Sequence, residues 1–112
     1  MTAEREKRRY RRREAQLPLR CRETLALPSP FRGVQMKDVS LGGLRFQDEG
    51  FIPPDTSLIF EFSLPRGGKP VRAISRVAWS RKLPSGDRYE FGGQFVEMLT
   101  SEKKFLEEYL LR

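Results

Sequence analysis

Short apolar runs along the chain predict a series of β-strands. Leucine, aromatic and β-branched residues gather in six stretches, and clusters of Pro, Gly and Asp separate these stretches as turns do. The six stretches are 17–27, 32–39, 44–47, 57–64, 71–80 and 89–96. Many short strands joined by tight turns, with no helical crossovers, are typical of an antiparallel barrel or sandwich.

Two of these stretches alternate apolar and polar positions. Residues two apart in a strand point to the same face, so each of these strands is expected to bury one face only. The expected inward-facing residues are Leu58, Phe60, Phe62 and Leu64 in one strand, and Val71, Ala73, Val77 and Trp79 in the other.

Several other positions are expected to serve packing. Trp79 and Phe91 are expected in the core or at its edge rather than as a platform for stacked bases. Cys21 is expected to be a small buried side chain, and Gly92 and Gly93 are expected to form a β-bulge.

The last twelve residues change to a helical period. Apolar side chains recur four residues apart, and Ser101 is suited to cap the first turn. The apolar pairs are Phe105 with Tyr109 and Leu106 with Leu110. This pattern predicts a helix over about 101–111 that packs on the sheet or on another chain, because so short a helix is marginal alone. The predicted fold is therefore all-β, a six-stranded antiparallel barrel with a short C-terminal helix.

The composition narrows the classes of function. The chain has 112 residues, enough for one core, with no histidine and a single cysteine. A structural zinc site, a Ser-His-Asp triad, a Cys-His pair and an intramolecular disulfide are thereby excluded. We expect a non-enzymatic protein without metal or cofactor, in a reducing, cytoplasmic setting. No apolar run is long enough to predict a membrane span or a secretory signal.

The net charge of +7 is concentrated near the N-terminus. Residues 1–32 hold 10 basic and 4 acidic side chains, whereas residues 33–112 hold 12 and 11. Like charges repel one another, so residues 1–15 are expected to form a flexible basic arm and residues 16–112 the barrel with its helix. Charge alone favours a solvated tail or an arm that binds polyanions without specificity.

Two short motifs lie on opposite sides of the first strand. Arg8-Arg9-Tyr10-Arg11-Arg12 contains an RxxxR spacing, and Asp38-Val39-Ser40-Leu41-Gly42-Gly43 contains a DxSxxG spacing. An antiparallel hairpin would return Asp38 and Ser40 to the place where the first strand begins, beside the arm. The two motifs are therefore expected to converge on one patch.

The residue types in these motifs suit a guanine nucleotide. An Arg fork can grip O6 and N7 of guanine, stack on the base or pair with phosphate, and an Asp carboxylate can accept from N1–H and N2–H. Ser40 can add a hydroxyl contact, and Gly43 is expected to allow close approach at a turn with unusual dihedral angles. Alternatively, Asp38, Ser40 and the glycines only build a turn; the presence of both motifs favours binding.

With both motifs in order inside an all-β pattern, the chain resembles a PilZ domain, the bacterial receptor module for cyclic di-GMP. The resemblance runs from Glu6-Lys7-Arg8-Arg9-Tyr10 through 38–46 to Phe91-Gly92-Gly93-Gln94-Phe95 and the terminal helix. It implies a six-stranded barrel that binds cyclic di-GMP between the arm and the barrel surface. The implied ligand-binding residues are Arg8, Arg9, Arg12, Asp38, Ser40 and Gly43.

The register of the arginine motif is not unique. Arg5 with Arg9 and Arg9 with Arg13 have the same spacing as Arg8 with Arg12. We prefer Arg8 and Arg12 because Tyr10 and Pro18 then stand where they resemble the family pattern. By the same resemblance, the residue before the first Arg, here Lys7, influences whether one ligand or an intercalated pair is held, and a cation is compatible with a pair.

The leading hypothesis is a non-catalytic receptor. Ligand binding would lock the arm onto the barrel and create a surface for an unknown downstream protein partner. One alternative is a basic nucleic-acid-binding barrel, against which stand the nearly neutral barrel and the lack of an obvious aromatic platform. Another is a PilZ-like adaptor that acts through protein contacts without ligand.

Overall fold

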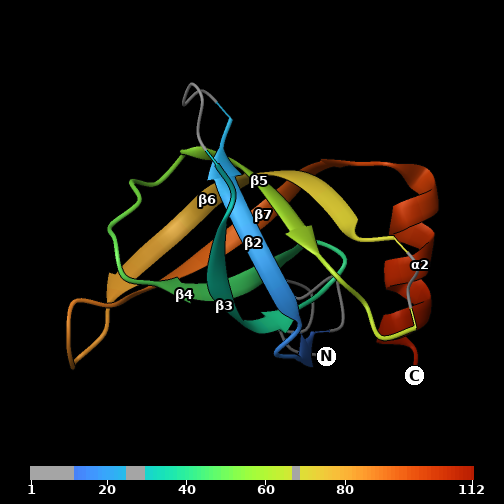
Figure 1. Ribbon diagram of the computed structural model, residues 1–112, viewed down its shortest axis with the longest axis horizontal. Coiled ribbons are helices and arrows are strands. Elements are labelled where there is room, and N and C mark those ends of the chain that lie inside the picture. Colours follow the sequence, from blue (N-terminus) through green and yellow to red (C-terminus); the bar gives the residue numbers. More distant parts are fainter. Residues whose placement is uncertain (1–11, 25–29, 67–68) are drawn as a thin grey trace, which may run out of the picture.

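The computed structural model describes residues 12–24, 30–66 and 69–112, and six of its strands close into an antiparallel barrel (Figure 1). The barrel strands are β2 (Pro18–Glu23), β3 (Arg32–Val39), β4 (Gly43–Asp48), β5 (Ser57–Phe62), β6 (Val71–Lys82) and β7 (Tyr89–Met98). Their order is β3-β2-β5-β6-β7-β4, and the pairing of β4 with β3 closes the ring. The helix α2 (Thr100–Leu110) lies at one end of the barrel. The predicted barrel with a C-terminal helix is confirmed.

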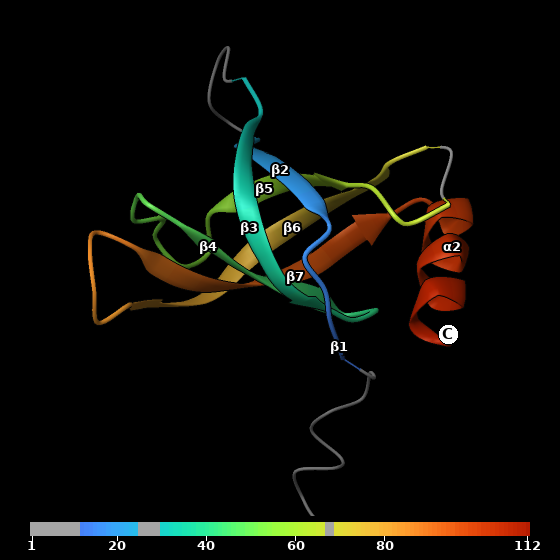
Figure 2. The ribbon, with the colours of Figure 1, turned by 60° about the horizontal axis from the view of Figure 1, so that its bottom comes forward.

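A short strand, β1 (Arg13–Glu14), lies along the same edge of β3 as β2 does (Figure 2). Arg13 pairs with Val39 and Glu14 with Asp38, and β2 continues along β3 from Pro18. Strand pairing thus begins within the segment that the sequence assigns to the arm. Residues 1–11 lie outside the described residues, so the division into a flexible arm and a barrel stays a prediction.

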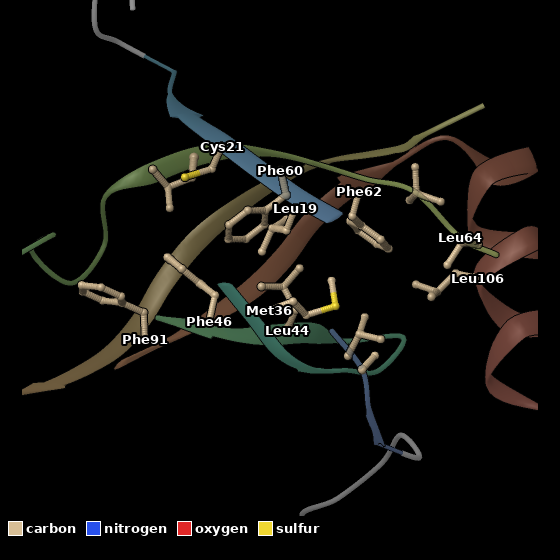
Figure 3. Packing of buried hydrophobic residues seen from close by; sticks show 14 of the residues in the cluster. Leu19, Cys21, Met36, Leu44, Phe46, Phe60, Phe62, Leu64, Phe91 and Leu106 are labelled. Atoms are coloured by element: carbon tan, nitrogen blue, oxygen red, sulfur yellow. The ribbon is translucent and has the colours of Figure 1, made fainter. Parts of the chain in front are cut away.

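Aromatic side chains fill the barrel (Figure 3). Phe46, Phe60, Phe62 and Phe91 are almost completely buried, and the Phe46 ring meets the Phe60 ring edge-on with 5.2 Å between centroids. Each such burial contributes about 1.5 to 3 kcal/mol. The predicted burial of Phe91 and Cys21 is confirmed, and burial raises the pKa of the Cys21 thiol to about 11. The predicted inward face of β5, with Leu64 after it, is also confirmed.

A bulge interrupts the alternation of β6. Val71, Ala73 and Val77 are buried as predicted, but Trp79 is 42% exposed. Val77 pairs with Gly93 and Trp79 with Gly92, which leaves Ala78 as an extra residue in β6. The prediction that Trp79 shares the inward face is therefore wrong. The β-bulge expected at Gly92 and Gly93 occurs where these residues pair with β6, but its extra residue, Ala78, lies in β6 and not in β7.

The helix α2 packs on its own barrel through Leu106, Tyr109 and Leu110, which are buried. It begins after Leu99, which makes no side-chain capping bond, so the cap predicted at Ser101 is wrong. Instead, the side chain of Glu102 in the first turn accepts the backbone N–H of Arg72 at 2.7 Å. No helix in the described part of the chain is long and apolar enough to cross a bilayer.

Candidate functional site

A groove of about 770 Å³ opens on the outer surface of the barrel. Its walls come from the start of β1, the turn between β3 and β4, and the paired middle parts of β6 and β7. Four predicted ligand-binding residues line it, namely Arg12, Asp38, Ser40 and Gly43. Arg8 and Arg9 lie outside the described residues, so their contribution stays a prediction.

The pairing of β1 with β3 brings the two motifs together. Because Glu14 pairs with Asp38, the side chains of these two residues share one face of the sheet, and residues two positions away on either strand lie on it as well. Arg12 and Ser40 are therefore placed on the groove side. This is the convergence that the hairpin argument predicts.

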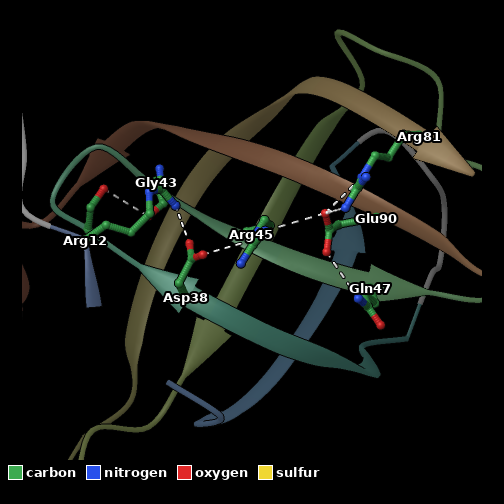
Figure 4. Close-up of polar contacts among 8 residues, drawn as sticks. Arg12, Asp38, Gly43, Arg45, Gln47, Arg81 and Glu90 are labelled. Atoms are coloured by element: carbon green, nitrogen blue, oxygen red, sulfur yellow. Dashed lines mark hydrogen bonds and ion pairs between the residues drawn. The ribbon is translucent and has the colours of Figure 1, made fainter. Parts of the chain in front are cut away.

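Asp38 is the most enclosed charged group that lines the groove, with 4% of its surface exposed. Its Oδ1 accepts a hydrogen bond from Nη1 of Arg12, and its Oδ2 lies 2.8 Å from Nε of Arg45 (Figure 4). A carboxylate only accepts hydrogen bonds, so Asp38 presents two acceptor oxygens at the groove wall. One oxygen faces a guanidinium from the chain before the barrel, and the other faces a guanidinium from the barrel.

Arg45 is in turn held by a second buried carboxylate. Its Nη1 lies 3.7 Å from Oε1 of Glu90, which also accepts from Nε and Nη2 of Arg81 at 3.1 and 2.8 Å. Burial alone would raise the pKa of Glu90, but hydrogen bonds from Gln47 and Arg81 and the charges of Arg45 and Arg81 together lower it. The result is a row of alternating charges across β3, β4, β7 and β6, in which Arg45 lies between the carboxylates of Asp38 and Glu90.

Ser40 and Gly43 shape the turn of the second motif. The Ser40 hydroxyl accepts the N–H of Gly42 at 3.1 Å and donates to the carbonyl of Gly43 at 3.3 Å. A Cβ on Gly43 would lie 2.1 Å from the carbonyl oxygen of Gly93 in β7. The backbone of Gly43 does not have a positive φ, so the expected unusual dihedral angles are wrong. Glycine is needed there because β4 and β7 approach closely.

Comparison with known families matches the PilZ domain model to residues 6–112. The chain belongs to the PilZ domain family. The match includes both motifs and the terminal helix. No curated protein shows a significant sequence match to the chain.

Several solved structures share the fold of this PilZ domain. The Bacillus subtilis inhibitor of motility MotI/DgrA superposes with a TM-score of 0.77 at 18% identity, over 94% of this chain and 49% of that one. YcgR in complex with c-di-GMP from Escherichia coli gives 0.71 at 15% identity, over 93% and 44%. The K. pneumonia MrkH–c-di-GMP complex gives 0.66 at 17% identity, over 93% and 51%. The chain thus spans about half the length of these proteins.

Trp79 is a groove residue of this PilZ domain that sequence reasoning missed. It lines the groove together with Gly92 and Gln94. The indole packs on Gly92 so closely that a Cβ there would lie 2.2 Å from its Nε1. An aromatic ring with 42% exposure can stack on a base while its other edge stays packed.

Arg13 turns away from the groove, although it is the neighbour of Arg12. Its Nη1 donates to the backbone carbonyl of Tyr109 in α2 at 2.7 Å, and its guanidinium lies 4.3 Å from the centre of the Tyr109 ring. Of the RxxxR registers in the sequence, the one that ends at Arg13 would therefore place its second arginine at α2. Of the neighbours Arg12 and Arg13, it is Arg12 that lines the groove of this PilZ domain.

Proposed function

We propose that this PilZ domain is a non-catalytic receptor for cyclic di-GMP, which binds in the groove between Arg12 and the β3–β4 turn. The observation that carries the proposal is the hydrogen bond between Arg12 and Asp38, from the two motifs, in the lining of one groove. The c-di-GMP complexes of YcgR and MrkH, which share the fold, support this choice of ligand.

Each groove residue has a role that its chemistry suits. The carboxylate of Asp38 accepts the N1–H and N2–H of guanine, which adenine does not offer in the same arrangement. The indole of Trp79 stacks on the base. Arg12 holds a phosphate or the O6 and N7 edge of guanine, with Arg8 and Arg9 joining it from the arm.

Binding requires an exchange of partners at Asp38. Arg12 donates to one carboxylate oxygen of Asp38, so guanine must take its place there. The displaced guanidinium is then next to the groove and free to pair with a phosphate. Arg45 keeps its contact with the other oxygen, so the buried carboxylate is never left without a cation.

We further propose that this exchange orders the arm on the barrel and so creates a surface for a downstream protein partner. The arm would gain contacts with the ligand that it lacks when free, which shifts its population toward the docked state. One ligand or an intercalated pair can satisfy this scheme. A cytoplasmic location stays a prediction.

Titration calorimetry with cyclic di-GMP tests the proposal, with cyclic di-AMP, GTP and a short RNA as competitors. We expect selective binding by the wild type. Asp38→Asn and Arg12→Ala should each weaken binding about 10- to 150-fold, as loss of a charge-assisted hydrogen bond does. Arg88→Ala is the matched control, because Arg88 lies outside the groove and bonds to Gln35.

Binding of cyclic di-AMP as tight as that of cyclic di-GMP would contradict the proposal. So would tight binding of RNA with no response to cyclic di-GMP, which would favour the nucleic-acid alternative. The fitted stoichiometry distinguishes one ligand from a pair.

A further inference from the structure

The two sides of β1 face two different parts of the molecule. Arg12 lies on the groove side and bonds to Asp38. Arg13, on the opposite side, bonds to Tyr109, which is 96 residues away in the sequence and only 6% exposed. Consecutive residues of an extended chain point in opposite directions, so one short strand contacts both the ligand groove and the terminal helix.

Arg13 places a positive charge at the C-terminal end of α2. The last carbonyl groups of a helix lack partners within the helix and carry partial negative charge, so a cation is favourable there. The last turn of α2 contains no basic residue. Arg13 supplies that cation from another element, by a hydrogen bond to the Tyr109 carbonyl, which also accepts the N–H of Arg112 at 3.3 Å, and by a contact with the Tyr109 ring.

Both β1 and α2, the elements that Arg13 joins, make few other contacts with the barrel. The strand β1 is two residues long and pairs only with β3. The helix has three buried side chains, and Glu102 holds its first turn to β6. Segments with so few contacts open locally at low free energy. Because Arg13 joins β1 to α2, each of these elements is more stable when the other is docked.

We infer that Arg13 is a positioning residue for the ligand site and that it makes α2 respond to the ligand. The inference rests on the proposed function of the groove. Docking of α2 fixes Arg13, which holds β1 in the register that aims Arg12 at the groove. In return, a ligand held at the groove keeps β1 in place and tightens the last turn of α2. The two effects are equal in size because coupling between two sites is reciprocal.

Hydrogen exchange of the α2 amides, measured with and without cyclic di-GMP, tests this inference in the whole chain. In the wild type, the ligand should slow exchange in the second half of α2 about fivefold or more. In Arg13→Met, exchange of α2 should be faster without ligand, cyclic di-GMP should bind about fivefold or more weakly, and the ligand should no longer slow exchange in α2.

Matched variants separate positioning from general destabilisation. Arg22→Met is the control for Arg13→Met, because Arg22 also lies over an aromatic ring, 5.5 Å from the centre of Phe31, but touches neither the groove nor α2. Tyr109→Phe keeps both contacts with Arg13 and should behave as the wild type. Tyr109→Leu removes the ring and should weaken ligand binding although it lies outside the groove.

Two results would overturn the inference. One is an Arg13→Met variant that binds cyclic di-GMP as tightly as the wild type does. The other is a wild type whose α2 exchange is the same with and without bound ligand. If the wild type does not bind cyclic di-GMP at all, the proposed function fails and takes the ligand-linked part of the inference with it. The ligand-free exchange of α2 in Arg13→Met still shows whether Arg13 ties β1 to the helix.

Discussion

Two buried carboxylates on the barrel surface, Asp38 and Glu61, are each held by two arginines. Asp38 forms ion pairs with Arg12 and Arg45, and Glu61 forms ion pairs with Arg20 and Arg72. Both are less than 10% exposed. At Glu61, hydrogen bonds from Arg72 and Arg20 outweigh the effect of burial and lower the pKa of the carboxyl group.

The difference lies in where the arginines come from. Both partners of Glu61 stand on strands that pair directly with β5, namely β2 and β6. Arg12 instead precedes β1, and beside it lies a groove that is lined by four glycines and by Trp79. An arginine on a neighbouring strand stabilises a sheet, whereas an arginine at the edge of a short strand can leave its carboxylate for a ligand.

Gly43, one of the glycines that line the groove, gives the largest expected effect. Gly43→Ala would place a methyl group 2.1 Å from the carbonyl oxygen of Gly93, so β4 and β7 must move apart. We expect a loss of about 3 kcal/mol in the free energy of unfolding, together with loss of cyclic di-GMP binding. Urea denaturation of the variant measures the first effect.

The control is Gly33→Ala in β3, where a Cβ meets nothing within 4 Å. Alanine is the better strand residue by roughly 0.5 to 1 kcal/mol, so this variant should be as stable as the wild type or slightly more stable. A Gly43→Ala protein with wild-type stability would show that the fold does not depend on the close approach of β4 to β7 at Gly43.

Much of the fold could be predicted from the sequence because it follows from local patterns. The alternation from Leu58 to Leu64 marks a half-buried strand, and it is the inward face of β5 and the turn after it. The strand β1 could not be predicted in this way. It consists of Arg13 and Glu14, which carry no apolar signal, and it exists because the edge of β3 beyond β2 offers unpaired backbone groups.

Glu61 gives the next effect, on stability rather than on binding. Glu61→Gln should lower the free energy of unfolding by about 1 kcal/mol at pH 7, a modest loss because Arg20 and Arg72 are more than half exposed and stay hydrated. Since the pKa of Glu61 is lowered by folding from 4.5, its contribution is complete above pH 4.5 and is lost as the pH falls through the folded value.

Urea denaturation at pH 7 and at pH 3 checks this contribution. The difference between wild type and Glu61→Gln should be largest at pH 7 and should shrink at pH 3. Binding of cyclic di-GMP at pH 7 should be unchanged in this variant, in contrast to Asp38→Asn. A Glu61→Gln variant that loses ligand binding would remove the distinction between the two carboxylates.

The candidate site could be predicted only in part, because the positions of some of its side chains depend on how neighbouring strands are paired. The motif spacing and the hairpin argument bring Asp38 and Ser40 beside Arg12, as the structure has them. Arg45 was missed because its place beside Asp38 depends on the register of β3 with β4, which shifts between Met36 and Asp38. Trp79 was missed because one extra residue in β6 reverses the side to which it points.

The smallest expected effect concerns Trp79, the aromatic side chain that lines the groove at Asp38. Trp79→Ala should weaken cyclic di-GMP binding about fivefold or more through loss of stacking, whereas Trp79→Phe keeps an aromatic face and should lose less. Because Trp79 is the single tryptophan of the chain, its fluorescence in the wild type should change on binding with the same affinity that calorimetry gives. Unchanged affinity in Trp79→Ala would mean that the base stacks elsewhere, and the polar contacts at Asp38 and Arg12 would then account for recognition without an aromatic wall.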